Sequence, residues 1–367
     1  MSTSTDTNTM SGGAGAGAST AGLGGSGPGV IGGTAAGGAS GRVGAESGGR
    51  ATDGGQAGAG AAGSQSGGVT GEGGRTASAG MSSTGGRSSN ERSISFGTLL
   101  DAEAVIRAAQ ALAQAQANPN AAEWRSKGDQ HRSYRFAEAD TTAPYRLYVP
   151  TTWDGQSMLT LVMFLHGSGA NENTYVDQNN KQLINLAQQG GFVLVAPLGD
   201  KGAYGNFLRL AAPFGKPDEA AKLMAQVTAD SEKTNELSER DVINVLELVL
   251  NEYPINRGAV FLTGHSMGSG GTWYIGGKYA KYWAGLAPMS GPFVQESGYP
   301  WESVRPISLF VTEGTQAPSL EGSRALRTWL DKNGFKVEYK EVNADHGGMV
   351  SLVLPSVFDF FVSLNAK

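Results

Sequence analysis

The apolar residues beyond position 130 fall into short continuous runs that alternate with amphipathic stretches. The run at 159–165, LTLVMFL, is almost continuously apolar and therefore predicts a strand that is buried on both faces of a sheet. Strand-like runs recur at 192–196, 259–263, 283–287 and 307–312, separated by helical patterns at 179–189, 238–253, 268–281 and 320–333. This alternation predicts a mostly parallel sheet covered by helices on both faces, with its active site at the carboxyl ends of the strands.

The flanks of this pattern add further elements. We expect edge strands at 132–138 and 144–149, and a last strand at 336–342 before a helix from about 350 to 364. A helix is also predicted at 98–117, and its apolar face consists of Leu99, Ala102, Ile106, Ala109 and Ala113. Because alanine makes this face weakly apolar, we expect the helix to pack against the domain rather than to bind a membrane.

Residues 1–91 differ in composition from the remainder of the chain. They consist almost wholly of Gly, Ala, Ser and Thr, with scarcely a large apolar side chain to offset the entropy lost on ordering. Glycine does not recur at every third position, which excludes a collagen triple helix. The composition predicts a disordered tail or linker at 1–91, a helix and connector at 92–130, and one folded domain at 131–367.

The bulk properties exclude several classes of function. The net charge is −5 and no run of Lys and Arg stands out, so we expect no nucleic-acid partner. Cysteine is absent, which excludes disulfides and thiolate metal sites. The N-terminal sequence MSTSTDTNTM has no basic patch before an apolar core, so we predict neither an export signal nor a transmembrane segment. Localisation stays open, because long Gly/Ala/Ser linkers also tether enzymes to surfaces.

The sequence GHSMG at 264–268 is typical of a nucleophile elbow. It lies where an apolar strand ends and a helix begins, which is the context that such a turn requires. The serine projects from a tight, strained turn, so the positions two residues to either side have no room for side chains. Ser266 is therefore the expected nucleophile, and an inert serine in a glycine-rich turn is the alternative.

From Tyr145 onward the chain resembles bacterial α/β-hydrolases grouped with feruloyl esterases, polyhydroxybutyrate depolymerase-like esterases and prolyl-oligopeptidase-like peptidases. The segments that carry the resemblance are LYVP, FLHGSGANENTY, VAPLG, ELSERDVINVLELV, GHSMGSGGTWY, EGSRAL and DHGGMV. The resemblance does not reach the tail or the helix near residue 100. It implies the α/β-hydrolase fold and a serine hydrolase that needs no cofactor.

Two backbone amides are expected to form the oxyanion hole, which holds the substrate oxygen. Met267 follows the nucleophile at the N-terminus of a helix, where developing negative charge is stabilised. Similarity to hydrolases with a His-Gly-x loop implies that Ser168, in the HGSG segment at 166–169, supplies the second amide. The side chain of His166 is interpreted as a buried structural histidine.

His346 is the expected general base. The chain has four histidines, of which His131 precedes the sheet, His166 belongs to the oxyanion loop and His265 adjoins the nucleophile and is expected to point elsewhere. His346 follows the last strand, in the order of nucleophile, acid and histidine that this fold requires. Its imidazole takes the proton of Ser266 during attack in the predicted mechanism.

The acid is where the sequence departs from the family. Relatives carry His-Gly-x-x-Asp-Pro after the seventh strand, whereas residues 313–318 read EGTQAP, with Ala317 in the aspartate position. Alanine can neither fix the tautomer of His346 nor stabilise its protonated form. Glu313, at the end of its strand, is the expected substitute. Glu321 is the second candidate, and a Ser-His dyad or an inactive enzyme are the further alternatives.

The segment at 198–237 is long for a crossing from strand to helix, and such segments usually form a lid or a pocket wall. We predict Tyr204, Phe207 and Phe214 as substrate-binding side chains, with packing of the insertion onto the domain as the alternative. No metal-ligand spacing is apparent. The predicted function is hydrolysis of a small-molecule or polymer-derived carboxylic ester through an acyl-serine intermediate. A serine peptidase and a tethered binding module built on an inactive hydrolase are the alternatives.

Overall fold

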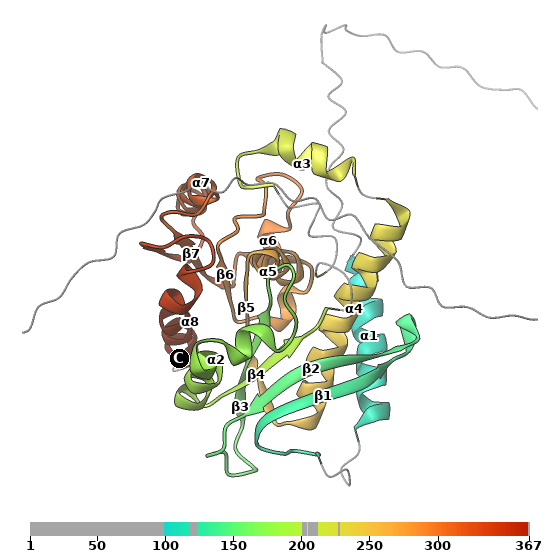
Figure 1. Cartoon of the computed structure of the whole chain (residues 1–367). Coiled ribbons are helices and arrows are strands. Elements are labelled where there is room, and N and C mark those ends of the chain that lie inside the picture. The colour runs from blue at the N-terminus through green and yellow to red at the C-terminus, as the bar shows by residue number, and fades with distance from the viewer. Residues whose placement is uncertain (1–98, 118–122, 200–203, 205–211, 227, 366–367) are drawn as a thin grey trace, which may run out of the picture. The chain divides into compact units, whose positions relative to one another are not determined.

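The computed structural model describes residues 99–117, 123–199, 204, 212–226 and 228–365 (Figure 1). The predicted disordered tail at 1–91 lies outside these residues, as does Phe207. All of the described residues belong to a single unit that spans 85–367. No helix among them combines the length and the apolarity that a membrane span needs.

A sheet of eight strands, in the order β1-β2-β4-β3-β5-β6-β7-β8, lies at the centre of this unit. Strands β3 to β8 run parallel to one another, and β2 is antiparallel to both β1 and β4. The mostly parallel sheet is thus confirmed, and each expected strand is present. The strands are β1 (Gly128–Phe136), β2 (Thr141–Val149), β3 (Leu159–Leu165), β4 (Phe192–Pro197), β5 (Ile255–His265), β6 (Gly285–Met289), β7 (Ser308–Gly314) and β8 (Val337–Val342).

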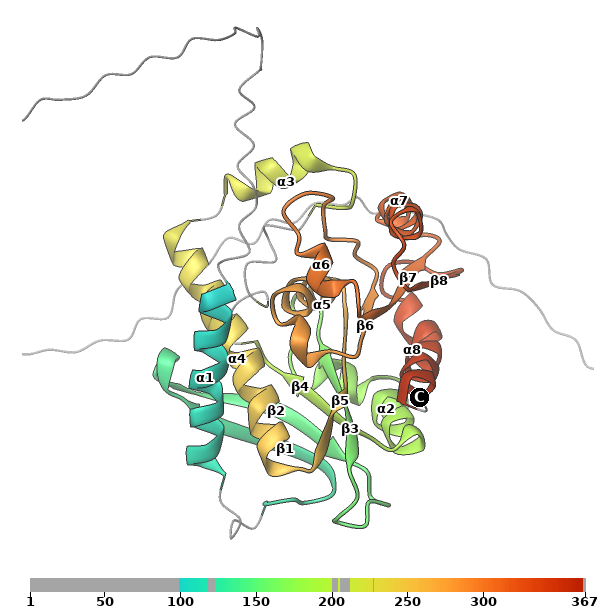
Figure 2. The same cartoon turned by 180° about the vertical axis from the view of Figure 1, so that it is seen from behind.

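Helices cover both faces of the sheet, with α2 and α8 on one face and α4 and α5 on the other (Figures 1 and 2). The helices are α1 (Leu99–Gln116), α2 (Thr174–Gly190), α3 (Pro217–Met224), α4 (Ala229–Glu252), α5 (Met267–Lys278), α6 (Trp301–Val304), α7 (Leu320–Lys332) and α8 (Met349–Asn365). Helices α3 and α6 were not predicted from the sequence, because helices this short have too few turns to show a helical period.

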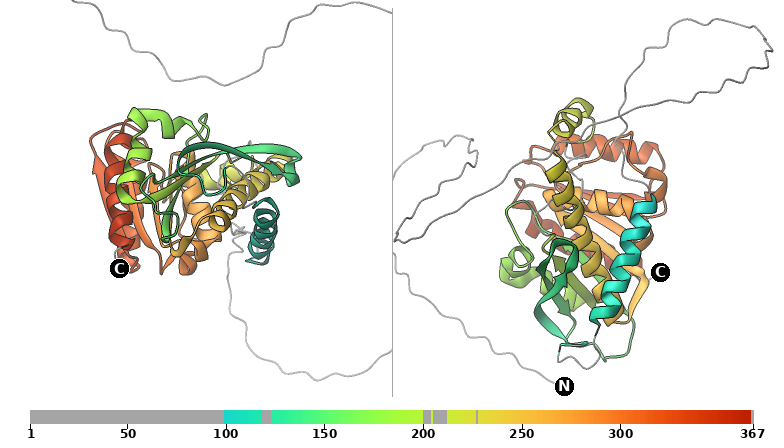
Figure 3. Two further views of the ribbon diagram at one scale, coloured as in Figure 1. Left: turned by 90° about the horizontal axis from the view of Figure 1, so that it is seen from below. Right: turned by 90° about the vertical axis from the view of Figure 1, so that its right-hand side faces the viewer.

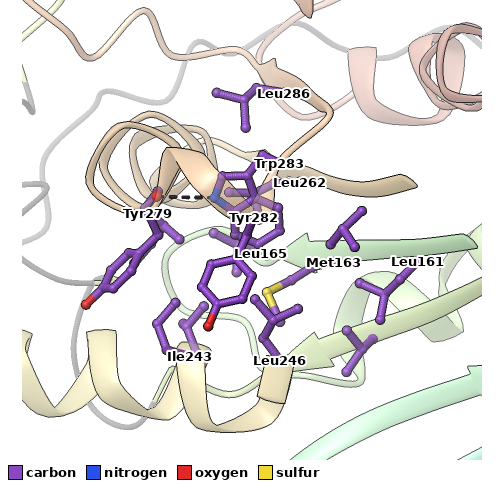
Figure 4. Close-up of a cluster of buried hydrophobic side chains, with 14 of the residues drawn as sticks. Leu161, Met163, Leu165, Ile243, Leu246, Leu262, Tyr279, Tyr282, Trp283 and Leu286 are labelled. Atoms are coloured by element: carbon purple, nitrogen blue, oxygen red, sulfur yellow. Dashed lines mark hydrogen bonds between the residues drawn. The ribbon is translucent and has the colours of Figure 1, made fainter. Parts of the chain in front are cut away.

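The side chains of β3 explain why its sequence is almost continuously apolar. Leu161, Met163 and Leu165 point into the core beneath α4 and α5, where they meet residues such as Ile243 (Figure 4). The alternate side chains, among them Val162, enter the second core beneath α2 and α8. Because successive side chains of a strand point to opposite faces, a strand between two helical layers needs an apolar residue at nearly every position.

Helix α1 packs on the outer side of α4 (Figures 2 and 3). Ile106, Ala109 and Ala113 of the predicted face are buried, as is Val105 beside them. An ion pair of 2.5 Å joins Glu103 to Lys281. The prediction that this helix packs against the domain is confirmed. The side chains of Leu99 and Ala102, which complete the predicted face, lie outside the described part of the chain.

Candidate active site

The candidate nucleophile stands between the end of β5 and the start of α5. Ser266 has φ 58° and ψ −115°, a strained backbone conformation that L-residues seldom adopt. Its amide donates a hydrogen bond of 3.0 Å to the carbonyl oxygen of Met289, which anchors the turn to β6. The serine is half-buried, so its hydroxyl remains within reach of a substrate.

The glycines of the elbow are needed because backbone passes close to both of them. A Cβ on Gly264 would lie 2.5 Å from the carbonyl oxygen of Gly268, and a Cβ on Gly268 would lie 2.0 Å from the carbonyl oxygen of Leu165. Neither obstacle is a side chain that could rotate away. The GxSxG pattern therefore reflects the close packing of α5 against the end of β3.

His346 lies in the loop between β8 and α8, with its imidazole facing the serine. Its Nε2 is 2.8 Å from the Oγ of Ser266, although 80 positions separate the two residues in the chain. This distance is suited to transfer of the serine proton to the ring.

Glu313, the expected acid, is fully buried at the end of β7 and reaches the imidazole through another residue. The Nδ1 of His346 is 2.7 Å from the Oγ of Ser290, and the same Oγ is 2.6 Å from Oε1 of Glu313. The direct contact between Glu313 and His346 that the sequence suggested is thus replaced by a serine bridge. Glu321 is exposed and pairs with Arg324, so it is not the acid.

The sheet order explains why Ser290 occupies this position. Strand β6 lies between β5 and β7, and Ser290 follows the last residue of β6 just as Ser266 follows the last residue of β5. The amide of Ser290 donates a hydrogen bond of 2.9 Å to the carbonyl oxygen of Thr312, the residue before Glu313. Ser290 was not predicted from the sequence. The available signal was its place immediately after a buried strand, but the order of the strands was needed to interpret it.

His265 is buried next to this group. Its Nδ1 is 2.7 Å from the hydroxyl oxygen of Tyr175, and its ring lies 4.7 Å from the His346 ring, centroid to centroid. The ring of His265 therefore contacts Tyr175 and the loop that carries His346, whereas the hydroxyl of Ser266 meets His346. The pKa of His265 is lowered to about 4, because burial disfavours the charged ring and the nearby His346 adds to this effect.

The predicted oxyanion loop follows β3 directly. Ser168 is exposed in a turn that a hydrogen bond of 3.2 Å closes between the amide of Ala170 and the carbonyl oxygen of Gly167. His166 is buried, and its Nε2 is 2.9 Å from the carbonyl oxygen of Leu198. Met267 is the first residue of α5, so its amide belongs to the free amides at a helix N-terminus.

Two of the three predicted substrate-binding residues, Tyr204 and Phe214, are described by the structure, and both are buried. Tyr204 has no exposed surface, and its hydroxyl accepts a hydrogen bond of 2.9 Å from the amide of His166. It therefore supports the predicted oxyanion loop through the backbone of His166. Phe214 is buried against Trp329 of α7, with ring centroids 5.8 Å apart. Both residues pack the insertion onto the domain, which was the alternative interpretation, and Phe207 lies outside the described residues.

A cavity of about 240 Å³ lies elsewhere, between α1, β1, β2 and α4. Two of its charged residues, Arg132 and Glu252, form an ion pair of 2.5 Å, and Ser266 and His346 do not line it. This cavity is therefore separate from the candidate active site. Within the described part of the chain, no group of three or more His, Cys, Asp or Glu is arranged to hold a metal ion.

No family model matches the sequence, and no curated protein matches it either. Among solved structures, a fluorophosphonate-binding serine hydrolase of Staphylococcus aureus is similar, with 16% identity, a TM-score of 0.50, and coverage of 65% of this chain and 99% of that one. An S-formylglutathione hydrolase of Staphylococcus aureus has 14% identity, a TM-score of 0.48, and coverage of 64% and 98%. A ferulic acid esterase of Anaeromyces mucronatus has 18% identity, a TM-score of 0.44, and coverage of 66% and 95%. The chain has the α/β-hydrolase fold.

Proposed function

We propose that this protein is a serine hydrolase that cleaves carboxylic esters through an acyl-serine intermediate. The observation that carries the proposal is the distance of 2.8 Å between Nε2 of His346 and Oγ of Ser266. The serine stands on a strained elbow at the carboxyl edge of the sheet, so its hydroxyl faces outward beside the base. These features support Ser266 as nucleophile and His346 as general base.

The first half of the reaction forms the acyl-enzyme. The Oγ of Ser266 attacks the ester carbonyl carbon while Nε2 of His346 takes the hydroxyl proton. The carbonyl oxygen becomes an oxyanion that accepts hydrogen bonds from the amides of Met267 and Ser168. His346 then gives its proton to the leaving alcohol oxygen, and the bond between this oxygen and the carbonyl carbon breaks.

The second half restores the enzyme by the same steps with water in place of the serine. A water molecule gives a proton to Nε2 of His346 and attacks the acyl carbon, and the proton then returns to Oγ of Ser266 as the carboxylic acid leaves. The protonated imidazole occurs twice in this cycle. The buried carboxylate of Glu313, on the other side of the ring, favours that charged state and completes the proposed catalytic group.

Labelling with a fluorophosphonate probe, together with hydrolysis of p-nitrophenyl acetate and butyrate, tests the proposal. The wild-type protein should be labelled at Ser266 and should hydrolyse the esters, and Ser266→Ala should lose both properties. Ser303→Ala, at an exposed position on α6, is the matched control and should behave as the wild type. Absence of labelling in the folded wild type, or equal ester hydrolysis by Ser266→Ala, would overturn the proposal.

A second comparison separates esters from amides. The ester and the anilide of one carboxylic acid differ only in the leaving group, so the ratio of their kcat/KM values reports the preferred bond. We expect the ester to be cleaved at least about a hundredfold faster. Equal or faster cleavage of the anilide would assign the same nucleophile to a peptidase instead.

A further inference from the structure

We infer that Ser290 is a positioning residue whose hydroxyl connects the imidazole of His346 to the carboxylate of Glu313. The inference rests on the proposed function, since it concerns how the general base is held. It explains how a carboxylate can still act on His346 although Ala317 occupies the position of the usual aspartate. The acid has moved to the end of the strand, and a hydroxyl spans the remaining gap.

The directions of the hydrogen bonds follow from the chemistry of the three groups. A carboxylate only accepts, so the Ser290 hydroxyl donates its proton to Oε1 of Glu313 over 2.6 Å. The lone pairs of the same oxygen then face Nδ1 of His346 at 2.7 Å, and this nitrogen must be the one that carries the proton. Nε2 is left unprotonated toward Ser266, which is the tautomer that a general base needs.

The surroundings of Glu313 fix the carboxylate in this role. Oε1 also accepts a hydrogen bond of 3.0 Å from the amide of Gly314, and Oε2 accepts bonds of 2.9 and 2.7 Å from the hydroxyls of Ser319 and Ser323. Both oxygens are therefore held by neutral donors in a site without solvent exposure. An ionised carboxylate is stabilised by such donors, and the Ser290 hydroxyl is the one among them that also touches the imidazole.

The backbone of Ser290 holds the hydroxyl in place. The residue has φ 51° and is 1% exposed, and its amide is bonded to Thr312. A serine with a positive φ at a buried strand end is a strained position, and strain of this kind concentrates at functional sites. The short side chain also suits the position, because a larger residue would separate His346 from the carboxylate.

Two single variants and their combination test the link, meaning the hydrogen-bonded connection from His346 through Ser290 to Glu313. Ser290→Ala removes the acceptor for Nδ1, and we expect kcat for p-nitrophenyl acetate to fall at least about a hundredfold with little change in KM. Glu313→Gln removes the charge and should lower kcat by about tenfold or more. Since both changes break one chain of interactions, the double variant should be about as slow as Ser290→Ala alone.

Ser323→Ala is the matched control, because it removes an equivalent hydroxyl from the other oxygen of the same carboxylate. This hydroxyl has no part in the contact with His346, so kcat should fall by no more than about threefold. The pH profile supplies a readout that a merely structural role would not move. Loss of the link should shift the acidic limb of kcat/KM to lower pH in Ser290→Ala and leave it in place in Ser323→Ala.

Ser290→Gly protects the test against a folding defect, since glycine accepts the positive φ while also removing the hydroxyl. Equal effects of Ser290→Ala and Ser323→Ala, an unchanged pH profile, or a double variant whose loss equals the product of the single losses would each overturn the inference. Fluorophosphonate labelling of the wild type distinguishes the two proposals. A labelled, active wild type with a fully active Ser290→Ala refutes the link alone, whereas an unlabelled wild type refutes the proposed function.

Discussion

The imidazole of His265 donates a hydrogen bond from Nε2 to the backbone carbonyl oxygen of His346, over 2.7 Å. A carbonyl can only accept, so Nε2 carries the proton, and the buried neutral ring presents a lone pair at Nδ1. The hydroxyl of Tyr175 therefore donates to Nδ1 over 2.7 Å. The residue before the nucleophile thus holds the loop that carries the base.

Replacement of His265 should lower the rate without touching the reacting atoms. His265→Ala removes the hydrogen bond to the carbonyl oxygen of His346 and leaves a cavity beside the ring of His346. We therefore expect kcat to fall about a hundredfold. His265→Gln places an amide N–H near the original Nε2 and should recover at least about a tenth of the wild-type kcat. The measurement is steady-state hydrolysis of p-nitrophenyl esters. A wild-type rate in His265→Ala would show that the base loop is held by other contacts.

The buried neutral His265 should also make stability depend on pH. Its folded pKa of about 4 lies below the value of about 6.5 for an unfolded chain, so the unfolded state binds more protons between these values. The free energy of unfolding should therefore fall as the pH drops from about 6.5 to about 4, by on the order of 3 kcal/mol from this group. Urea denaturation at pH 7, 5.5 and 4 should show a smaller fall for His265→Gln. Parallel curves for the two proteins would contradict this assignment.

Gly268→Ala should be among the most damaging single changes in the fold. The new Cβ would lie 2.0 Å from the carbonyl oxygen of Leu165, so α5 must move away from β3 and carry Ser266 with it. We expect a loss of about 3 kcal/mol or more of stability and no measurable esterase activity. Gly258→Ala is the control, since its Cβ would meet only the side chain of Asn256 at 3.4 Å. Thermal unfolding and ester hydrolysis of both variants decide the point.

Tyr204→Phe should affect the oxyanion loop. The phenol oxygen is the acceptor for the buried amide of His166, and its removal leaves that amide unpaired. The expected loss of stability is about 1–3 kcal/mol, and displacement of the neighbouring Ser168 should lower kcat by about tenfold. Tyr253→Phe removes a hydroxyl that donates to the carbonyl oxygen of Ser126, on a different part of the domain. This control should lose stability. Its kcat, measured well below its melting temperature, should equal that of the wild type.

Local pattern alone was enough to predict the main elements of the fold. Every expected strand is present, because a strand such as β3, buried on both faces, has an almost continuously apolar sequence. The elbow could be predicted for a similar reason. Backbone packing around Gly264 and Gly268 excludes any side chain, so only glycine fits there and the sequence shows the constraint directly.

Other features depended on which strands are neighbours. The choice of Glu313 from sequence was made by position along the chain, but the contact with His346 runs through Ser290 because β6 lies between β5 and β7. The aromatic residues of the insertion gave a misleading signal. Tyr204 and Phe214 are equally suited to a pocket or to packing, and only their burial in the folded domain distinguished these roles.

The sequence by itself determined the strand and helix order, the strained turn and its serine, and the histidine after the last strand, because each depends on residues that are close in the chain. Tertiary structure alone decided how the acid reaches that histidine and what holds the base loop. Both depend on side chains such as Ser290 and His265, whose partners lie 56 and 81 positions away and are brought near by the sheet. Contacts between such distant residues produce no periodic pattern in a single sequence. Which residues make them is known only when the order of the strands is known.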